Sequence, residues 1–420
     1  MSISPARSAS NPAALAMAIH PPLTPARLRR SLILITWLFF LMYAGTGIYF
    51  PFINVFYRSA GLSGTEIGLI NMTGGIAAFL ASTLWGYLSD RSGKPRILLA
   101  IASAGTAIVA LLFPLFHSFF SFLILGTIFP FFNIAIVTLM DSNLLAILGE
   151  NRADYGRYRL GGTFGYMLTS ATVGFLFRDH GIAIMFPIFA GIAFVFAVCV
   201  LFMPDLAIER RVSVRSPRAI LGMMRRRSWL VFAVSVFLVW IAGSGAISFL
   251  SVSLKSMGAE DTLIGIVSAS AALFEIPFML YNGWFLRKLG SRRMLSLSLV
   301  GYVARVGLYS LMPSPVWGIA VNALNGVSYV WMWNASINYA NELAPDELKA
   351  TAQGLFVSTT ALSAMVSAPF AGWIFDQLGP PGMFRIFAAV ALVAVFIFWF
   401  GERPQKLHNP GLTDPIEEIS

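Results

Sequence analysis

Residues 86–93 read GYLSDRSG, and residues 283–290 repeat this pattern as GWFLRKLG. A second pair of segments has the same spacing between its two glycines: residues 174–181 read GFLFRDHG, and residues 372–379 read GWIFDQLG. The members of each pair occupy corresponding places in the two halves of the chain, after the second or the fifth long apolar run. The sequence therefore predicts two structurally similar halves joined in tandem.

The composition places these halves in a membrane. Hydrophobic residues make up 57% of the 420 residues and charged residues only 11%, against about 25% charged in soluble domains, and the mean hydropathy is +0.75. The net charge of +10 is carried by short loops between apolar runs, which indicates membrane orientation and no nucleic-acid partner. The single cysteine, Cys199, cannot build a disulfide framework or a clustered metal site, and no cofactor is expected.

The apolar runs define the expected fold, because crossing about 30 Å of hydrocarbon takes roughly 20 helical residues. Such runs lie near residues 31–56, 64–88, 97–116, 119–145, 157–178, 181–203, 229–254, 261–286, 294–313, 316–342, 352–375 and 381–402. We expect an all-α membrane protein with twelve transmembrane helices in two pseudo-symmetric six-helix bundles. The expected parts are a disordered cytoplasmic tail (1–30), an N-terminal bundle (31–203), a basic cytoplasmic linker (204–228), a C-terminal bundle (229–402) and a cytoplasmic tail (403–420).

Most Lys and Arg residues fall in connectors on one side of these runs. Cytoplasmic loops carry such an excess, so we expect both termini in the cytoplasm and the protein in the plasma membrane, the inner membrane of a bacterium. Residues 1–30 have no short apolar core followed by a small-residue cleavage site, so we interpret them as a tail and not as a signal peptide.

An acid and an arginine flank the connector between the fourth and fifth spans, where residues 141–166 read DSNLLAILGENRADYGRYRLGGTFGY. Asp141 ends one apolar run and Arg159 begins the next. Charges at membrane depth are costly, so they predict a substrate or ion pathway with each charge as the partner of the other. Together the two groups suit a sugar or a nucleoside, and Arg159 alone suits the carboxylate of an aromatic acid.

Helical spacing adds candidate ligands to the fifth span. Thr163, Tyr166 and Ser170 share a stripe with Arg159. We therefore include Thr163 and Tyr166 in the predicted substrate site. For Thr163 and Ser170, hydroxyl groups that only hold membrane helices together are the alternative.

In the connector that contains GYLSDRSG, we expect Gly93 to supply a tight turn. This connector resembles the signature loop of the major facilitator superfamily. In that family the acid of this loop meets the start of the eleventh helix when the cytoplasmic side is shut, and a carboxylate is favoured at a helix N-terminus. The resemblance therefore implies a gating role for the loop. The residues to which it assigns this role are Gly86, Asp90, Arg91, Gly93 and Arg96. A merely topogenic basic loop is the alternative.

A closer resemblance covers both halves. The residues Tyr155-Gly-Arg-Tyr-Arg159 are similar to the start of helix five in the lactose permease (oligosaccharide:proton symporter) and phenylpropionate permease group, and Tyr49-Phe-Pro51 resembles the end of helix one there. The resemblance implies that Asp141 and Arg159 hold the substrate. The chain departs from that group on helix ten, where the relatives carry a histidine and this chain has Asn325.

In the second half, Glu275 on the eighth span and Arg305 on the ninth are the only charges in the middle of a span. Movement of the carboxyl relative to the guanidinium would load and release a proton, so we assign proton coupling to Glu275, Arg305 and Asp141. A fixed structural ion pair is the alternative. On the tenth span, Asn325 and Tyr329 are candidate substrate ligands, because amides are poorly placed toward lipid.

The residues and the resemblance together predict a secondary active transporter for a small organic solute, working by alternating access in symport with protons. An uncoupled facilitator and a proton-driven drug or metabolite exporter are the alternatives within the same fold. A membrane enzyme would need a metal motif, a nucleophile with its base or a phosphate loop, and we find none at membrane depth. The expected partners are the solute, protons and the lipid bilayer, and a monomer suffices.

Overall fold

The computed structural model describes residues 25–149, 154–204 and 217–401, and all secondary structure in these ranges is helical. The expected all-α fold is thereby confirmed. The expected tail over 403–420 lies outside the described residues, as do residues 1–24 of the N-terminal tail and 205–216 of the linker. Residues 25–30, expected in the tail, are helical.

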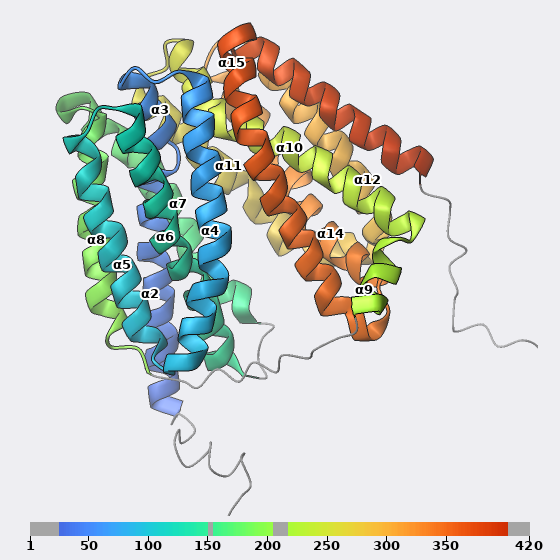
Figure 1. Cartoon of the computed structure of the whole chain (residues 1–420), viewed down its shortest axis with the longest axis horizontal. Helices are drawn as coiled ribbons and strands as arrows, with labels where there is room; N and C mark the ends of the chain where they lie inside the picture. The colour runs from blue at the N-terminus through green and yellow to red at the C-terminus, as the bar shows by residue number, and fades with distance from the viewer. Residues whose placement is uncertain (1–24, 150–153, 205–216, 402–420) are drawn as a thin grey trace, which may run out of the picture.

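The first half consists of helices that run back and forth along one direction (Figure 1). They are α2 (Pro25–Tyr49), α3 (Ile53–Ser59), α4 (Gly64–Ser92), α5 (Pro95–Leu112), η1 (Phe113–Leu115), α6 (Phe119–Leu148), α7 (Tyr155–His180), η3 (Ile182–Ile184) and α8 (Met185–Val200).

The second half begins with a short helix inside the expected linker. Its elements are α9 (Pro217–Met224), α10 (Arg227–Ser256), α11 (Asp261–Leu280), α12 (Asn282–Tyr309), α13 (Trp317–Asn322), η4 (Gly326–Val330), α14 (Trp331–Leu343), η5 (Asp346–Leu348) and α15 (Lys349–Gly401). The element η4 is a π-helical turn.

Nine segments of the described chain are long and apolar enough to cross a membrane. One of them contains both of the last two expected spans, because α15 continues through Gly379, where the backbone leaves the helical region. The expected ninth and tenth spans, in α12 and in α13 to α14, are not among the nine. The count of twelve therefore stays a prediction.

All four repeated glycine segments end in a glycine with a positive φ angle. Their closing glycines, Gly93, Gly181, Gly290 and Gly379, have φ angles of 60°, 76°, 75° and 67°. Gly93 is in the left-handed helical region, with ψ 15°, whereas the other three have ψ between 159° and 179°. Residues other than glycine rarely adopt a positive φ in either region. Each closing glycine therefore ends one helix and lets the next begin, and the turn predicted at Gly93 is confirmed.

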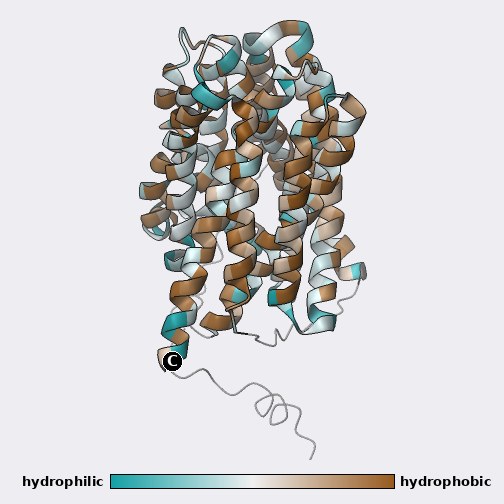
Figure 2. Ribbon diagram, turned by 90° about the vertical axis from the view of Figure 1, so that its left-hand side faces the viewer, coloured by the Kyte–Doolittle hydropathy of each residue, from teal (hydrophilic) through white to brown (hydrophobic). Residues whose placement is uncertain are grey.

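Apolar side chains cover the outer surface. Phe120 and Phe194 are 72% and 66% exposed, and hydrophobic residues predominate along the middle of the helices, whereas most hydrophilic ones lie toward their ends (Figure 2). A soluble monomer rarely exposes apolar surface on this scale. The surface suits lipid, in agreement with an integral multi-pass membrane protein.

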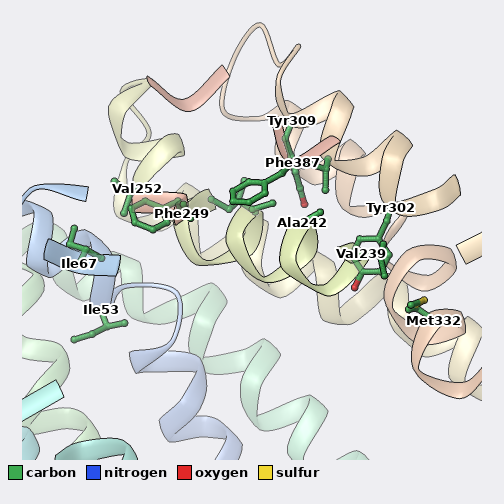
Figure 3. Close-up of a cluster of buried hydrophobic side chains, with 14 of the residues drawn as sticks. Ile53, Ile67, Val239, Ala242, Phe249, Val252, Tyr302, Tyr309, Met332 and Phe387 are labelled. Atoms are coloured by element: carbon green, nitrogen blue, oxygen red, sulfur yellow. The ribbon is translucent and has the colours of Figure 1, made fainter. Parts of the chain in front are cut away.

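The two halves meet at one end of the helices, which we name the Gly64 end and which also carries Gly174, Asp261 and Gly372. Toward the opposite end, named the Asp90 end, α4 and α14 diverge (Figure 1). One buried core runs through the junction, from Ile53 and Ile67 in the first half to Phe249 and Val252 on α10 (Figure 3).

A glycine contact within the first half gives a test of this packing. A Cβ at Gly165 on α7 would overlap the carbonyl oxygen of Phe40 on α2. Gly165→Ala should therefore destabilise the protein by about 1–3 kcal/mol and lower its Tm in detergent. Gly191→Ala is the control, because a Cβ there meets nothing within 4 Å. Equal Tm values for both variants would contradict the close approach of α2 and α7.

Candidate functional site

A cavity of about 870 Å³ lies between the halves. Tyr49, Asn54 and Tyr166 line it from the first half, and Ser248, Ser268 and Asn322 from the second. Among the described residues that line the cavity, none carries a charge. The space thus offers amide and hydroxyl groups beside aromatic and aliphatic walls, as ligand sites commonly do.

A hydrogen bond between the halves, supported by a second one within the first half, bounds the cavity toward the Gly64 end. The Asn54 amide donates to the Ser248 carbonyl oxygen over 2.7 Å and accepts a bond of 3.3 Å from Asn71. Close to this junction, a Cβ at Gly265 on α11 would overlap the Ser170 carbonyl oxygen on α7. The backbones of the two halves are therefore in direct contact here.

Asp141 and Arg159 lie on neighbouring helices as predicted, but they do not pair directly. The Tyr155 hydroxyl donates to the Asp141 carboxylate over 2.7 Å. Arg159 Nη2 donates to the Tyr43 hydroxyl over 2.7 Å, and its guanidinium carbon lies 5.8 Å from the ring centroids of both Tyr43 and Tyr155. The expected direct contact is replaced by a tyrosine, because Tyr155 stands one helical turn before Arg159 on the same face of α7.

This arrangement leaves Arg159 available to a ligand. Its side chain is exposed in the structure, and it is close enough to Glu275 and Tyr329 in the second half to interact with them electrostatically. The guanidinium thus faces the junction between the halves. Sequence reasoning missed Tyr43 as its partner, since a lone tyrosine in an apolar span gives no signal of what its hydroxyl contacts.

The other residues predicted on α7 differ in their surroundings. Tyr166 lines the cavity and lies within electrostatic range of Glu275. Ser170 is fully buried, and its hydroxyl donates to the Tyr166 carbonyl oxygen over 2.7 Å. Ser170 therefore serves packing, whereas Thr163 is half-buried.

Glu275 and Arg305 are joined through Asn325. The Asn325 amide donates to the Glu275 carboxylate over 2.5 Å, and its oxygen accepts a bond from Arg305 Nη1. Both Arg305 and Asn325 are 4% exposed. The predicted pair is thus a relay in which a neutral amide lies between the half-buried carboxyl of Glu275 and the buried guanidinium of Arg305.

Asn322 holds the other side of the guanidinium. Its oxygen accepts bonds from Arg305 Nη2 over 3.1 Å and from the Tyr309 hydroxyl over 2.6 Å. Its amide nitrogen donates to the Val267 carbonyl oxygen on α11 over 2.7 Å. Asn322 therefore ties α11, α12 and α13 together and also lines the cavity.

The helix that carries these amides is irregular. Residues 326–330 form the π-helical turn η4 directly after Asn325, and such turns are frequent at functional sites. Within this turn, Tyr329 is half-buried, and its ring contacts that of Trp240 edge to face with centroids 5.9 Å apart. The turn sets the direction of Asn325 and Tyr329, which regular helical spacing cannot predict.

The predicted gating residues lie at the Asp90 end, away from the second half. Gly86 is buried and Asp90 is exposed. Arg91 donates to the Tyr87 hydroxyl over 3.2 Å, and Arg96 is half-buried and has an interaction partner. Asp90 makes no hydrogen bond or ion pair with the start of α15 in the described residues. The contact implied by the resemblance is absent from this conformation.

The residues that the structure describes hold no group of three or more His, Cys, Asp or Glu side chains suited to a metal ion.

The comparisons with known proteins agree with this geometry. A model described as the MFS_1 like family matches residues 32–386. The chain belongs to this family of major facilitator transporters. It is a transporter and not an enzyme.

The relatives carry several substrate names. The chain is 28% identical to a maltose permease of Geobacillus stearothermophilus over 86% of this chain and 91% of the relative. It is 25% identical to a probable 3-phenylpropionic acid transporter of Escherichia coli (strain K12) over 86% of this chain and 95% of the relative. A mutant of the nucleoside transporter NupG has the same fold, with a TM-score of 0.80 at 18% identity, covering 89% of this chain and all of that one.

The bonds of Asn322 give a test of the relay. Asn322→Ala should lower the stability by about 1–3 kcal/mol, because Arg305 and Tyr309 lose a buried acceptor. Thermal unfolding of the purified protein measures this. Asn338→Ala is the matched control, since the Asn338 amide donates to Asn334 in its own helix. A Tm for Asn322→Ala equal to that of the control would show that the network contributes nothing to stability.

Proposed function

We propose that the protein is a secondary active transporter that imports a small organic solute by alternating access, in symport with a proton. The observation that carries the proposal is the Glu275–Asn325–Arg305 relay beside a cavity that is bounded at the Gly64 end. Ionisable groups at membrane depth are costly and mark substrate and proton pathways.

The cavity chemistry favours a neutral solute rich in hydrogen-bonding groups, such as a sugar or a nucleoside. Its described lining combines amides and hydroxyls with tyrosine rings, and Asn322 and Tyr166 extend this surface to the charged relay. The predicted ligands are Asp141, Arg159, Thr163, Tyr166, Asn325 and Tyr329. An aromatic acid is the alternative class of substrate, because the exposed guanidinium of Arg159 can bind a carboxylate.

Proton coupling is assigned to the carboxyl of Glu275. Protonation of this carboxyl removes the negative charge that accepts the hydrogen bond from the Asn325 amide. The connection from Glu275 through Asn325 to Arg305 is thereby weakened. Asp141, whose carboxylate accepts the bond from Tyr155, is the second acid of the pathway. Binding and protonation can therefore be coupled through side chains that face one junction between the halves.

An uncoupled facilitator of the same fold is supported by one observation. Arg305 donates hydrogen bonds to Asn322, Asn325 and Tyr309, and none of these acceptors is a carboxylate. A network satisfied in this way can be a fixed structural element. In that case the cycle needs no change in the protonation of Glu275.

The orientation that we propose places the Asp90 end and both termini in the cytoplasm of a bacterial inner membrane. Arg91 and Lys94, together with Arg225, Arg226 and Arg227 at the start of α10, lie at that end and are exposed. Positive residues gather on the cytoplasmic side of membrane proteins. The cavity is then bounded on the periplasmic side.

Arg159→Lys tests the substrate site. A point charge cannot reproduce the planar fork of the guanidinium, so the affinity for the transported solute should fall about ten-fold or more. The solute is first found by ligand-induced thermal shift with a panel of sugars, nucleosides and aromatic acids, and its affinity is then measured by titration. Arg157→Lys is the control, because Arg157 is exposed on the same helix and nearer the connector. Unchanged affinity in Arg159→Lys removes Arg159 from the site.

Glu275→Gln tests the coupling. The variant cannot exchange a proton at this position, so uphill accumulation in proteoliposomes should be lost while solute exchange continues. Glu347→Gln is the control, since Glu347 is an exposed acid at the Asp90 end. Accumulation that survives in Glu275→Gln would favour the fixed network and the uncoupled facilitator.

A further inference from the structure

Asp376 on α15 closes a contact across the two halves at the Gly64 end. One carboxylate oxygen accepts the backbone N–H of Gly64 over 2.7 Å. The other accepts the backbone N–H and the hydroxyl of Thr65, over 2.7 Å and 2.8 Å. A side chain of the second half thus caps the first turn of α4 in the first half.

The backbone N–H groups of Gly64 and Thr65 have no acceptor within α4 or its capping box, so they need one from elsewhere in the protein. A helix starts with four N–H groups that lack a partner in the preceding turn. Ser63 and Glu66 form a capping box, in which the Ser63 side chain accepts the Glu66 N–H, and Ile67 N–H bonds to the Ser63 carbonyl oxygen. Gly64 and Thr65 are the positions that the local sequence does not satisfy, and Asp376 satisfies both.

Close backbone approach makes the cap possible. A Cβ at Gly372, one turn before Asp376, would overlap the Gly64 carbonyl oxygen. The helices α4 and α15 lie side by side where the halves meet (Figure 1). The carboxylate is therefore placed at the positive end of the α4 dipole, where negative charge is favoured, and its bonds exist only while this end is shut.

The repeated segments relate Asp376 to Asp90. Asp90 follows Gly86 by the same number of residues by which Asp376 follows Gly372. Asp90 lies in the last turn of α4, at the end of the molecule where α15 begins. The helix pair thus carries one acid near each end, of which Asp376 is engaged and Asp90 is exposed without a described partner.

In the other two repeated glycine segments, the residue at the position that corresponds to Asp90 and Asp376 is basic. Arg178 follows Gly174 at this spacing, and Arg287 follows Gly283. The start of α11, which packs on the end of α7, instead has its own acid Asp261, bonded to Lys255 over 2.6 Å. A carboxylate that caps the opposite half is therefore particular to the pair formed by α4 and α15.

We propose that Asp376 is the positioning residue that holds the Gly64 end shut during the transport cycle, and that it alternates with Asp90 as the cap between α4 and α15. The proposal rests on the alternating access of the proposed function. Opening the Gly64 end breaks three hydrogen bonds to one carboxylate, and shutting the Asp90 end offers the Asp90 carboxylate the start of α15. The two caps then favour opposite states of the same pair of helices.

The test measures the separation of the halves without solute or proton gradient. In a Cys199→Ser background, spin labels at His117→Cys and Leu311→Cys mark exposed positions that belong to different halves at the Gly64 end. Asp376→Asn removes the negative charge at the start of α4 and one of the two acceptor oxygens, so it should raise the ratio of open to shut ends about five-fold. Asp90→Asn should change this ratio in the opposite direction.

A second variant at the same contact and a control variant complete the experiment. Thr65→Val removes a single bond to Asp376 and should give a smaller shift in the same direction, which also serves if Asp376→Asn does not fold. Asp179→Asn is the control, because it neutralises another exposed acid near this end and should leave the distances unchanged. If the spin-label distances show an open and a shut population whose ratio does not change in Asp376→Asn or Thr65→Val, the proposal is overturned. A single separation in every variant would contradict alternating access itself.

Discussion

Polar groups that enter a hydrocarbon layer must find their partners inside the protein, and this constraint organises the interior of the molecule. Arg305 shows it most clearly. This residue is 4% exposed, and its guanidinium donates hydrogen bonds to acceptors on α12 and on the irregular helix beside it. Asn322 and Asn325 bind this charge and donate to α11. These bonds hold α11, α12 and α13 together in addition to apolar packing.

The junction between the halves uses a different chemistry from the interior of each half. Beside the apolar core that crosses it, the junction contains close glycine contacts, neutral amides and one carboxylate that caps a helix. Such contacts lose little when they separate, because backbone groups and amides can bind water instead. The hydrogen bonds of the charged relay, by contrast, are all made within the second half, so separation of the halves at the junction does not have to break them.

The sequence predicted much of the fold and part of the site. The apolar runs predicted the helical membrane protein, and the repeated glycines predicted the turn at Gly93, because hydrophobicity and backbone freedom are local properties. Asp141, Arg159, Glu275 and Arg305 were selected by the cost of burying charge. Their actual partners were not predictable. Tyr43 lies far from Arg159 in the sequence, and the π-helical turn directly after Asn325 interrupts the regular spacing from which the contacts of this helix would be inferred.

By itself, the sequence determined which residues must avoid lipid and where the chain must turn, since these follow from composition and spacing. Only the tertiary structure decided which polar groups meet across helices, and that the Gly64 end is closed by Asn54 and Asp376 while Asp90 remains exposed. The physical reason is that a hydrogen bond depends on positions within a few tenths of an ångström. Those positions are fixed by how the helices pack and by the conformation of the two halves.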